Sequence, residues 1–186
     1  MPTSAHELFS RSFDALSEGD AFTTRGRTVT EADVVSFSAL TGDWHPQHAD
    51  AEWAKSSQFG ERVAHGMLLI SYAAGLVPFD PERVVALRRI DDVVFKRPVK
   101  FGDTIHVEGK IETLKALDEE LGLATCAWKI VNQNDELVAR LRIQAVWRSE
   151  AKGDAADQDE DSDEEASEDG SSDEESSRDA EGAVSQ

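Results

Sequence analysis

The segment Gly66–Val77, GMLLISYAAGLV, is apolar or small at almost every position and stops at Pro78. No apolar run in the chain approaches the roughly 18 residues that suggest a membrane span. In a soluble fold, a helix that is apolar on every side is buried on every side. The remainder of the chain must therefore supply a layer that wraps around this helix.

The second half of the chain has the composition and the periodicity of β-strands. Apolar and polar residues alternate along Ile105–Thr113, Leu121–Val131 and Leu137–Arg148, and a period of two is typical of strands. Further strands are expected at Val84–Phe95 and near Ala21–Val29. Because the turns between the last three strands are short, these strands form an antiparallel meander. We therefore predict an α+β fold, in which a curved antiparallel sheet of about five strands is wrapped around one central helix.

A helix is also predicted upstream of the buried segment. Thr30 is its expected N-cap, since the acidic Asp33 occupies the third helical position, and Gly42 ends the apolar pattern. A second short helix is expected near Ala51–Lys55. The sequence GDWHPQH (42–48) therefore lies in the connection between two helices.

The charge is distributed very unevenly along the chain. Residues 150–186 contain sixteen Asp and Glu but two Lys and Arg, a net charge of −14, which leaves −5 of the total −19 for residues 1–149. Residues 150–186 have no aromatic residue and no Leu, Ile or Met, so they cannot bury enough apolar surface to fold. We expect a folded domain over 1–149 and a disordered acidic tail over 150–186.

Composition also excludes several classes of protein. The acidic charge of both parts argues against sequence-independent nucleic-acid binding, which needs clustered Lys and Arg. The single cysteine, Cys126, excludes an internal disulfide and a Cys-rich zinc site. The first residues lack the basic and apolar regions of a secretory signal. We therefore expect a cytoplasmic protein with no nucleic-acid partner and no membrane span.

The densest group of reactive side chains is the segment Thr41–His48, TGDWHPQH. Asp43 and His48 lie five residues apart in a stretch that Gly42 and Pro46 keep from being helical. An Asp and a His on one rigid loop can share a water molecule, one residue taking its proton while the other donates a proton to a substrate. The alternative is a surface loop with a capping Asp and two solvated histidines.

The second candidate is AHGM (64–67), at the beginning of the buried helix. The first turn of a helix offers unpaired backbone N–H groups and a partial positive charge, which suit a developing oxyanion. Gly66 would let a ligand carbonyl come close to the backbone there. The alternative is that Gly66 only permits close packing of the helix against the sheet, and that His65 caps the helix or fills space.

Together these segments resemble the MaoC-like, (R)-specific enoyl-CoA hydratase family of hot-dog-fold proteins, over about residues 10–148. The family motif is Gly-Asp, any residue, Asn-Pro, any residue and His, and GDWHPQH matches it except at His45. AHGM, Phe59-Gly60 and RPVKFGDTI (97–105) also match family positions in the expected order. Several motifs in one order are much more specific than any motif alone.

The resemblance implies a reaction and a set of roles. Asp43 and His48 would activate a water molecule and deliver a proton to the α-carbon of a trans-2-enoyl-CoA, an acyl-CoA thioester. The backbone N–H of Gly66 would polarise the thioester carbonyl, and the product would be an (R)-3-hydroxyacyl-CoA, or the reverse dehydration would occur. No metal is implied, and no cofactor except coenzyme A as part of the substrate. Family members usually dimerise, so we expect a homodimer or a heterodimer with a similar hot-dog subunit.

Five further residues are expected to contact the substrate: His45, His65, Met67, Ala74 and Arg97. His45 stands where the family has Asn, and it either takes over the amide's role in holding the loop or alters the site, because an imidazole presents its donor and acceptor in a different geometry. Arg97 would meet the phosphates of coenzyme A, or it belongs to a solvated strand face. Small residues such as Ala74 would leave room for an acyl chain, or they only allow close helix packing.

Other functions stay open at this point. Within the same fold, the protein would be a 3-hydroxyacyl-ACP dehydratase subunit or a thioesterase, which differ in the acyl carrier and in the leaving group. From another class, it would be a non-catalytic acyl-CoA-binding or scaffold subunit, with His45 marking a degenerate site.

Overall fold

The computed structural model describes residues 3–150. The acidic tail predicted over 150–186 lies outside the described residues, apart from Glu150. Within the described part of the chain, no helix is both long enough and apolar enough to cross a membrane.

The first half of the domain is mostly helical and the second half is mostly strands, as predicted. The helices are α1 (Ala5–Phe9), α2 (Glu31–Thr41), α3 (Pro46–Ala49), α4 (Ala51–Ser56) and α5 (Gly66–Leu76), with a 3₁₀ turn over Phe13–Ala15. The strands are β1 (Thr3–Ser4), β2 (Ala21–Thr23), β3 (Arg27–Thr28), β4 (Val84–Phe95), β5 (Thr104–Ala116), β6 (Leu121–Asn132) and β7 (Leu137–Arg148). The four long strands lie where alternation and composition place them, whereas the strand predicted near 21–29 is divided into β2 and β3.

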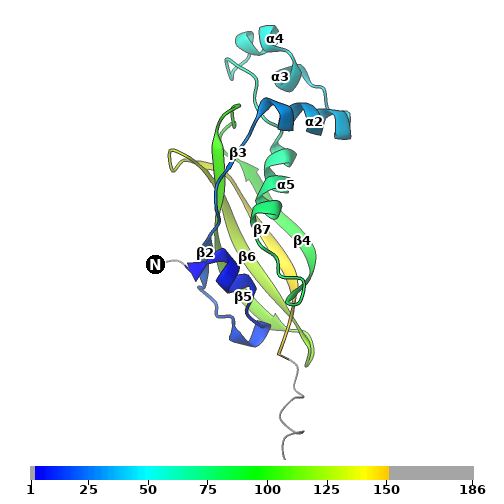
Figure 1. Ribbon diagram of the computed structural model, residues 1–186, viewed down its shortest axis with the longest axis vertical. Helices are drawn as coiled ribbons and strands as arrows, with labels where there is room; N and C mark the ends of the chain where they lie inside the picture. The colour runs from blue at the N-terminus through cyan, green and yellow to red at the C-terminus, as the bar shows by residue number, and fades with distance from the viewer. Residues whose placement is uncertain (1–2, 151–186) are drawn as a thin grey trace, which may run out of the picture. The chain divides into compact units, whose positions relative to one another are not determined.

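The strands form one sheet in the order β1-β2-β5-β6-β7-β4, with β3 paired to β5. Antiparallel pairing joins β5 to β6, β6 to β7 and β7 to β4. The long strands curve around α5, which lies along the inner face of the sheet (Figure 1). The predicted architecture, a curved antiparallel sheet around one central helix, is confirmed.

Helix α5 buries a set of side chains that face the core: Leu68, Leu69, Ile70, Ala73 and Leu76. The prediction of burial on every side is wrong for one stripe. Met67, Ser71 and Gly75 are exposed, Met67 to 62%. Because they recur every four positions, these residues share one helix face, and that face is turned away from the sheet.

The core between α5 and the sheet is built from inward-facing residues of β5, β6 and β7. Cys126 on β6 belongs to this core and is 1% exposed. Burial raises the pKa of its thiol to about 12. Near α1, aromatic rings close the core, with the Phe9 ring 5.1 Å from the rings of Phe22 and Trp147.

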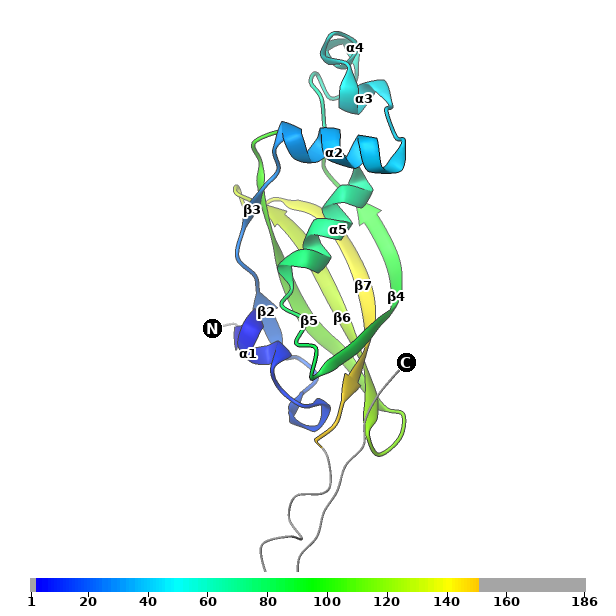
Figure 2. The same cartoon turned by 45° about the vertical axis from the view of Figure 1, so that its right-hand side comes forward.

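Helices α2, α3 and α4 lie together at the end of the sheet that the N-terminal end of α5 approaches (Figure 2). Thr30 and Asp33 form a capping box at the start of α2, with Thr30 N donating to Asp33 Oδ2 at 2.7 Å and Asp33 N donating to Thr30 Oγ1 at 3.2 Å. Burial alone raises the pKa of Asp33, but hydrogen bonds from Tyr72 and Thr30 and the charge of Arg27 outweigh it and lower this pKa to about 2. The ionised box fixes α2, whose other end leads into the loop that carries Asp43.

Candidate active site

Asp43 lies on a short loop that begins where α2 ends. Gly42 adopts a left-handed conformation, with φ of 78°, and its N–H donates to Ser38 O, so the helix stops there. Asp43 N donates to Thr41 Oγ1 at 3.3 Å, and Asp43 Oδ1 accepts from His45 N at 3.2 Å. The Asp43 side chain remains 52% exposed, so its carboxylate can hold water.

His45 is the N-cap of α3. Its Nδ1 accepts from Gln47 N at 3.2 Å, and Pro46 occupies the first helical position. A side-chain acceptor at an N-cap normally comes from Asn, Asp, Ser or Thr. Here the imidazole performs this capping role, so the one departure from the family motif leaves the turn into α3 intact.

His48 on α3 is buried and held by the Val63 carbonyl, which accepts from His48 Nδ1 at 2.7 Å. Because a carbonyl only accepts, Nδ1 carries the proton and Nε2 keeps its lone pair. Gln47 Nε2 lies 3.0 Å from His48 Nε2 and donates to it. Burial lowers the pKa of His48 below its ordinary 6.5, which favours the neutral ring with its lone pair at Nε2.

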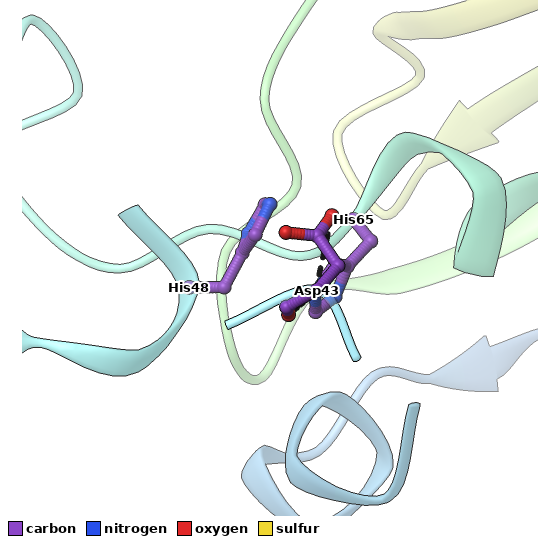
Figure 3. A group of neighbouring side chains, drawn as sticks. All are labelled: Asp43, His48 and His65. Atoms are coloured by element: carbon purple, nitrogen blue, oxygen red, sulfur yellow. Dashed lines mark hydrogen bonds and ion pairs between the residues drawn. The ribbon is translucent and has the colours of Figure 1, made fainter. Parts of the chain in front are cut away.

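His65 lies between Asp43 and His48. Its ring is stacked on the His48 ring, with centroids 3.7 Å apart and 27° between the planes. Its Nε2 lies 3.0 Å from the Asp43 carbonyl oxygen and 3.9 Å from Asp43 Oδ2. Figure 3 shows the three side chains meeting from three separate segments of the chain.

The N-terminus of α5 completes the site. As the first residue of α5, Gly66 has a backbone N–H with no acceptor inside the helix. A Cβ atom on Gly66 would lie 2.6–2.9 Å from three atoms of the Phe95 ring. Any larger residue at position 66 would therefore have to displace the ring of Phe95, the last residue of β4.

These groups line one cavity of about 590 Å³. Most of the residues predicted to act lie in its wall: Asp43, His48, His65, Gly66, Met67 and Arg97. The Arg97 guanidinium is held by Glu136, with Nε 3.4 Å from Oε1, and donates to the Leu137 carbonyl at 3.1 Å. His45 and Ala74 are not in the cavity wall, since His45 caps α3 and Ala74 lies further along α5.

Sequence analysis missed three residues of the site. Phe37 and Phe95 contribute aromatic wall to the cavity, and the Val63 carbonyl sets the tautomer of His48. A backbone carbonyl has no sequence signature, so Val63 could not be found. Phe95 ends a predicted strand and lies two residues before Arg97, a predicted site residue, so its position in the sequence could have indicated that it lies at the site.

The same cluster has the donor set of a metal site. Asp43, His48 and His65 each place one ligand atom within 4.8 Å of the others. An imidazole lone pair lies in the plane of its ring, and these two rings are stacked almost parallel, so their lone pairs do not converge on one point. His65 Nε2 also donates to the Asp43 carbonyl. The arrangement is therefore suited to proton transfer rather than to metal binding.

A curved sheet around one helix, with an Asp–His pair beside the helix N-terminus, defines a hot-dog-fold protein with a cavity at that end of the helix. The family model described as MaoC like domain matches residues 15–126, and the chain belongs to this family.

Individual relatives agree with this assignment. Protein MaoC of Klebsiella aerogenes is 46% identical over 100 residues, which are 53% of this chain but 30% of that protein. An (R)-specific enoyl-CoA hydratase of Aeromonas caviae is 31% identical over 106 residues, 57% of this chain and 77% of that enzyme. The structure of a monoamine oxidase regulatory protein from Archaeoglobus fulgius has a TM-score of 0.72 and 36% identity, covering 76% of this chain and 96% of that one. The chain thus spans less than a third of Protein MaoC.

Proposed function

We propose that the protein is an (R)-specific enoyl-CoA hydratase that adds water across a trans-2-enoyl thioester, or catalyses the reverse dehydration. One observation carries this proposal: His48, whose Nδ1 donates to the Val63 carbonyl and whose Nε2 lone pair accepts from the Gln47 amide, lies in the same cavity as the Asp43 carboxylate and the Gly66 N–H. The reaction requires a base, a carboxylate that holds the water molecule, and a hydrogen-bond donor for the oxyanion.

The reaction follows from these three groups. A water molecule held by Asp43 replaces the Gln47 amide at His48 Nε2 and gives this nitrogen a proton, and the water oxygen bonds to the β-carbon of the enoyl thioester. The electrons of the carbon–carbon double bond move to the thioester oxygen, where the Gly66 N–H and the helix N-terminus stabilise the enolate. The Asp43–His48 pair then returns one proton to the α-carbon. The thioester supplies the electrophilic chemistry, so this sequence of steps calls for no metal, flavin or nicotinamide.

Hydration of crotonyl-CoA and of longer trans-2-enoyl-CoAs tests the proposal, followed by the loss of the ultraviolet absorbance of the enoyl thioester. We expect Asp43→Asn and His48→Ala each to lower turnover by about 10²–10⁴, the usual contribution of general acid–base groups. His106→Ala and Asp91→Asn are matched controls outside the cavity and should turn over like the wild type. Activity near that of the wild type in Asp43→Asn or His48→Ala would contradict the assigned roles.

The same panel separates the other functions. Release of free coenzyme A thiol would indicate a thioesterase, and turnover restricted to acyl carrier protein substrates would indicate a carrier-protein dehydratase. Acyl-CoA binding without turnover would indicate a non-catalytic subunit. We favour a catalytic protein over a non-catalytic subunit because His45 preserves the cap of α3, and with it the position of His48.

A further inference from the structure

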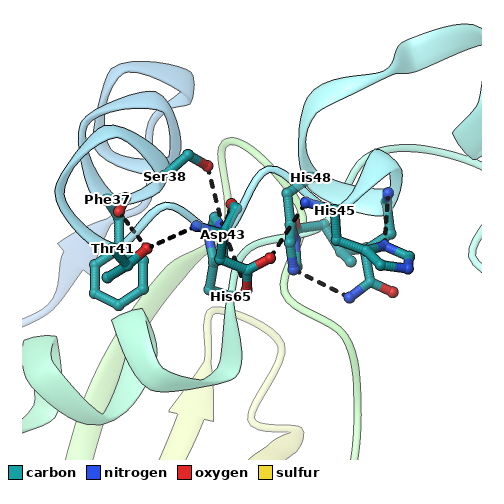
Figure 4. Close-up of polar contacts among 9 residues, drawn as sticks. Phe37, Ser38, Thr41, Asp43, His45, His48 and His65 are labelled. Carbon is teal, nitrogen blue, oxygen red and sulfur yellow. Dashed lines mark hydrogen bonds and ion pairs between the residues drawn. The ribbon is translucent and has the colours of Figure 1, made fainter.

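We infer that His65 is a positioning residue that holds Asp43 and His48 in place, and not a substrate contact; this inference rests on the proposed function. The His65 side chain is 3% exposed, so almost none of it is available to a ligand. It directly precedes Gly66 at the beginning of α5. One buried ring therefore connects the loop of Asp43, the ring of His48 and the helix that provides the oxyanion donor (Figure 4).

The first connection is a hydrogen bond to the main chain of Asp43. The Asp43 carbonyl lies 3.0 Å from His65 Nε2, and Ser38 Oγ lies 3.3 Å from the same nitrogen. Because the carbonyl can only accept, Nε2 carries the proton and donates to it. The loop that follows Gly42 is mostly exposed, and this bond ties it to the beginning of a packed helix.

The second connection is the stack on His48. One neighbour of the His65 ring is His48 at 3.7 Å between centroids, and another is Phe37 at 5.0 Å. The His48 ring is also fixed by its bond to the Val63 carbonyl. With the stack in place, the His48 ring cannot turn away, and its Nε2 is kept at the position where the water proton must be taken.

The other ring nitrogen of His65, Nδ1, shows which atom makes histidine useful at this position. Within residues 3–150, the buried Nδ1 has no hydrogen-bond partner. Burying an unpartnered acceptor is unfavourable, and an apolar ring of similar shape would avoid that cost. Because Nδ1 makes no hydrogen bond, the benefit of an imidazole over an apolar ring at this position is the hydrogen bond from Nε2–H to the Asp43 carbonyl.

Two variants separate the donor from the ring. His65→Gln keeps an N–H donor at about the reach of Nε2, whereas His65→Phe keeps an aromatic ring against His48 and removes the donor. We expect His65→Phe to lower kcat by about 10–100-fold with little change in KM, because a small misplacement of catalytic groups costs that much. His65→Gln should recover most of this loss, and the control His106→Phe should match the wild type. A raised KM with unchanged kcat in His65→Phe would show a substrate contact and overturn the inference.

A second measurement needs no turnover. Imidazole nitrogen NMR spectra of the unliganded wild-type protein should show His65 protonated at Nε2 and His48 protonated at Nδ1. If crotonyl-CoA is not hydrated but both tautomers are found, the proposed function fails while the positioning contact stands. Protonation of His65 at Nδ1 alone would mean that the bond to Asp43 is not made, and the inference would be wrong even if the enzyme is active.

Discussion

At the scale of single residues, the protonation of His48 decides when the site is ready to react. Burial is the largest cause that lowers the pKa of His48 below 6.5, and the nearby His65 and His45 add to it. The Val63 carbonyl and the Asp43 carboxylate act in the opposite direction. Only the neutral ring has a lone pair at Nε2, so the fraction of active protein follows this equilibrium.

The pH dependence of kcat/KM should therefore fall on the acid side with a midpoint below 6.5, because kcat/KM reports the ionisation of the free enzyme. Crotonyl-CoA hydration measured across the acid range gives this midpoint. Phosphate groups titrate near pH 6, so a crotonyl thioester of a phosphate-free thiol is the necessary control. A midpoint above 6.5 with both substrates would contradict a neutral, buried base.

The same ionisation affects stability with a definite sign. In the unfolded chain His48 titrates near 6.5, so below that pH the unfolded state binds a proton that the folded state does not. The free energy of unfolding therefore decreases as the pH falls from 6.5 toward the folded pKa, and it is unaffected by His48 above 6.5.

At the scale of elements, the contact between β4 and α5 is a single close approach. Gly66→Ala would drive its Cβ into the Phe95 ring, which is 47% exposed and can move. We expect a loss of about 1 kcal/mol in the free energy of unfolding, the low end for overpacking, and lower activity because the displaced ring or helix disturbs the site. Thermal unfolding and crotonyl-CoA turnover measure the two effects.

The Phe95→Ala background tests the cause of that loss. With the ring absent, Gly66→Ala should cost no further stability and no further activity. If Gly66→Ala lowers turnover equally in both backgrounds, the added methyl group obstructs the substrate and not the packing.

The long strands were predictable because one buried face imposes alternation. Ile105 and Val107 point into the core while Glu108 and Lys110 point out, and a period of two records this in the sequence. The break between β2 and β3 was not predictable, because it depends on a side chain. Thr24 Oγ1 accepts from Val107 N at 3.0 Å, in place of a backbone carbonyl.

The site shows the same division between local and long-range information. The spacing of Asp43 and His48 indicated a shared function, because both lie between α2 and α4. The prediction that the whole stretch is non-helical is wrong for His48, which lies on α3, because Pro46 fits the first position of a helix. The His48–His65 stack needs α3 and α5 to pack together, and no local pattern encodes that packing. The two possible roles of His45 could be separated only when its hydrogen bond to Gln47 was visible.

At the scale of the whole molecule, β4 has the features of a subunit interface. Within residues 3–150, β4 pairs with β7 alone, so its other edge is free. Large apolar side chains are exposed along it: Val85, Leu87, Ile90, Val93 and Phe95. A free edge with exposed apolar side chains is the kind of surface that a second subunit covers.

We therefore expect a dimer of a 20.4 kDa chain in analytical ultracentrifugation at micromolar concentration. Ile90→Lys should weaken it, because a charge would replace an apolar contact on β4. Leu117→Lys is the matched control, since Leu117 is 48% exposed against 42% for Ile90 but lies beyond the end of β5. A wild-type protein that sediments as a monomer and is fully active would contradict the expectation.

The single cysteine of the chain gives the molecule a built-in probe. Cys126 is 1% exposed in the middle of β6, and its pKa of about 12 leaves almost no thiolate while the sheet is closed. A thiol-directed reagent therefore reacts only in the moments when the central strands separate. The labelling rate of Cys126 therefore measures how often the sheet around α5 opens, without an engineered reporter. A second cysteine placed on the surface would measure local motion in the same experiment.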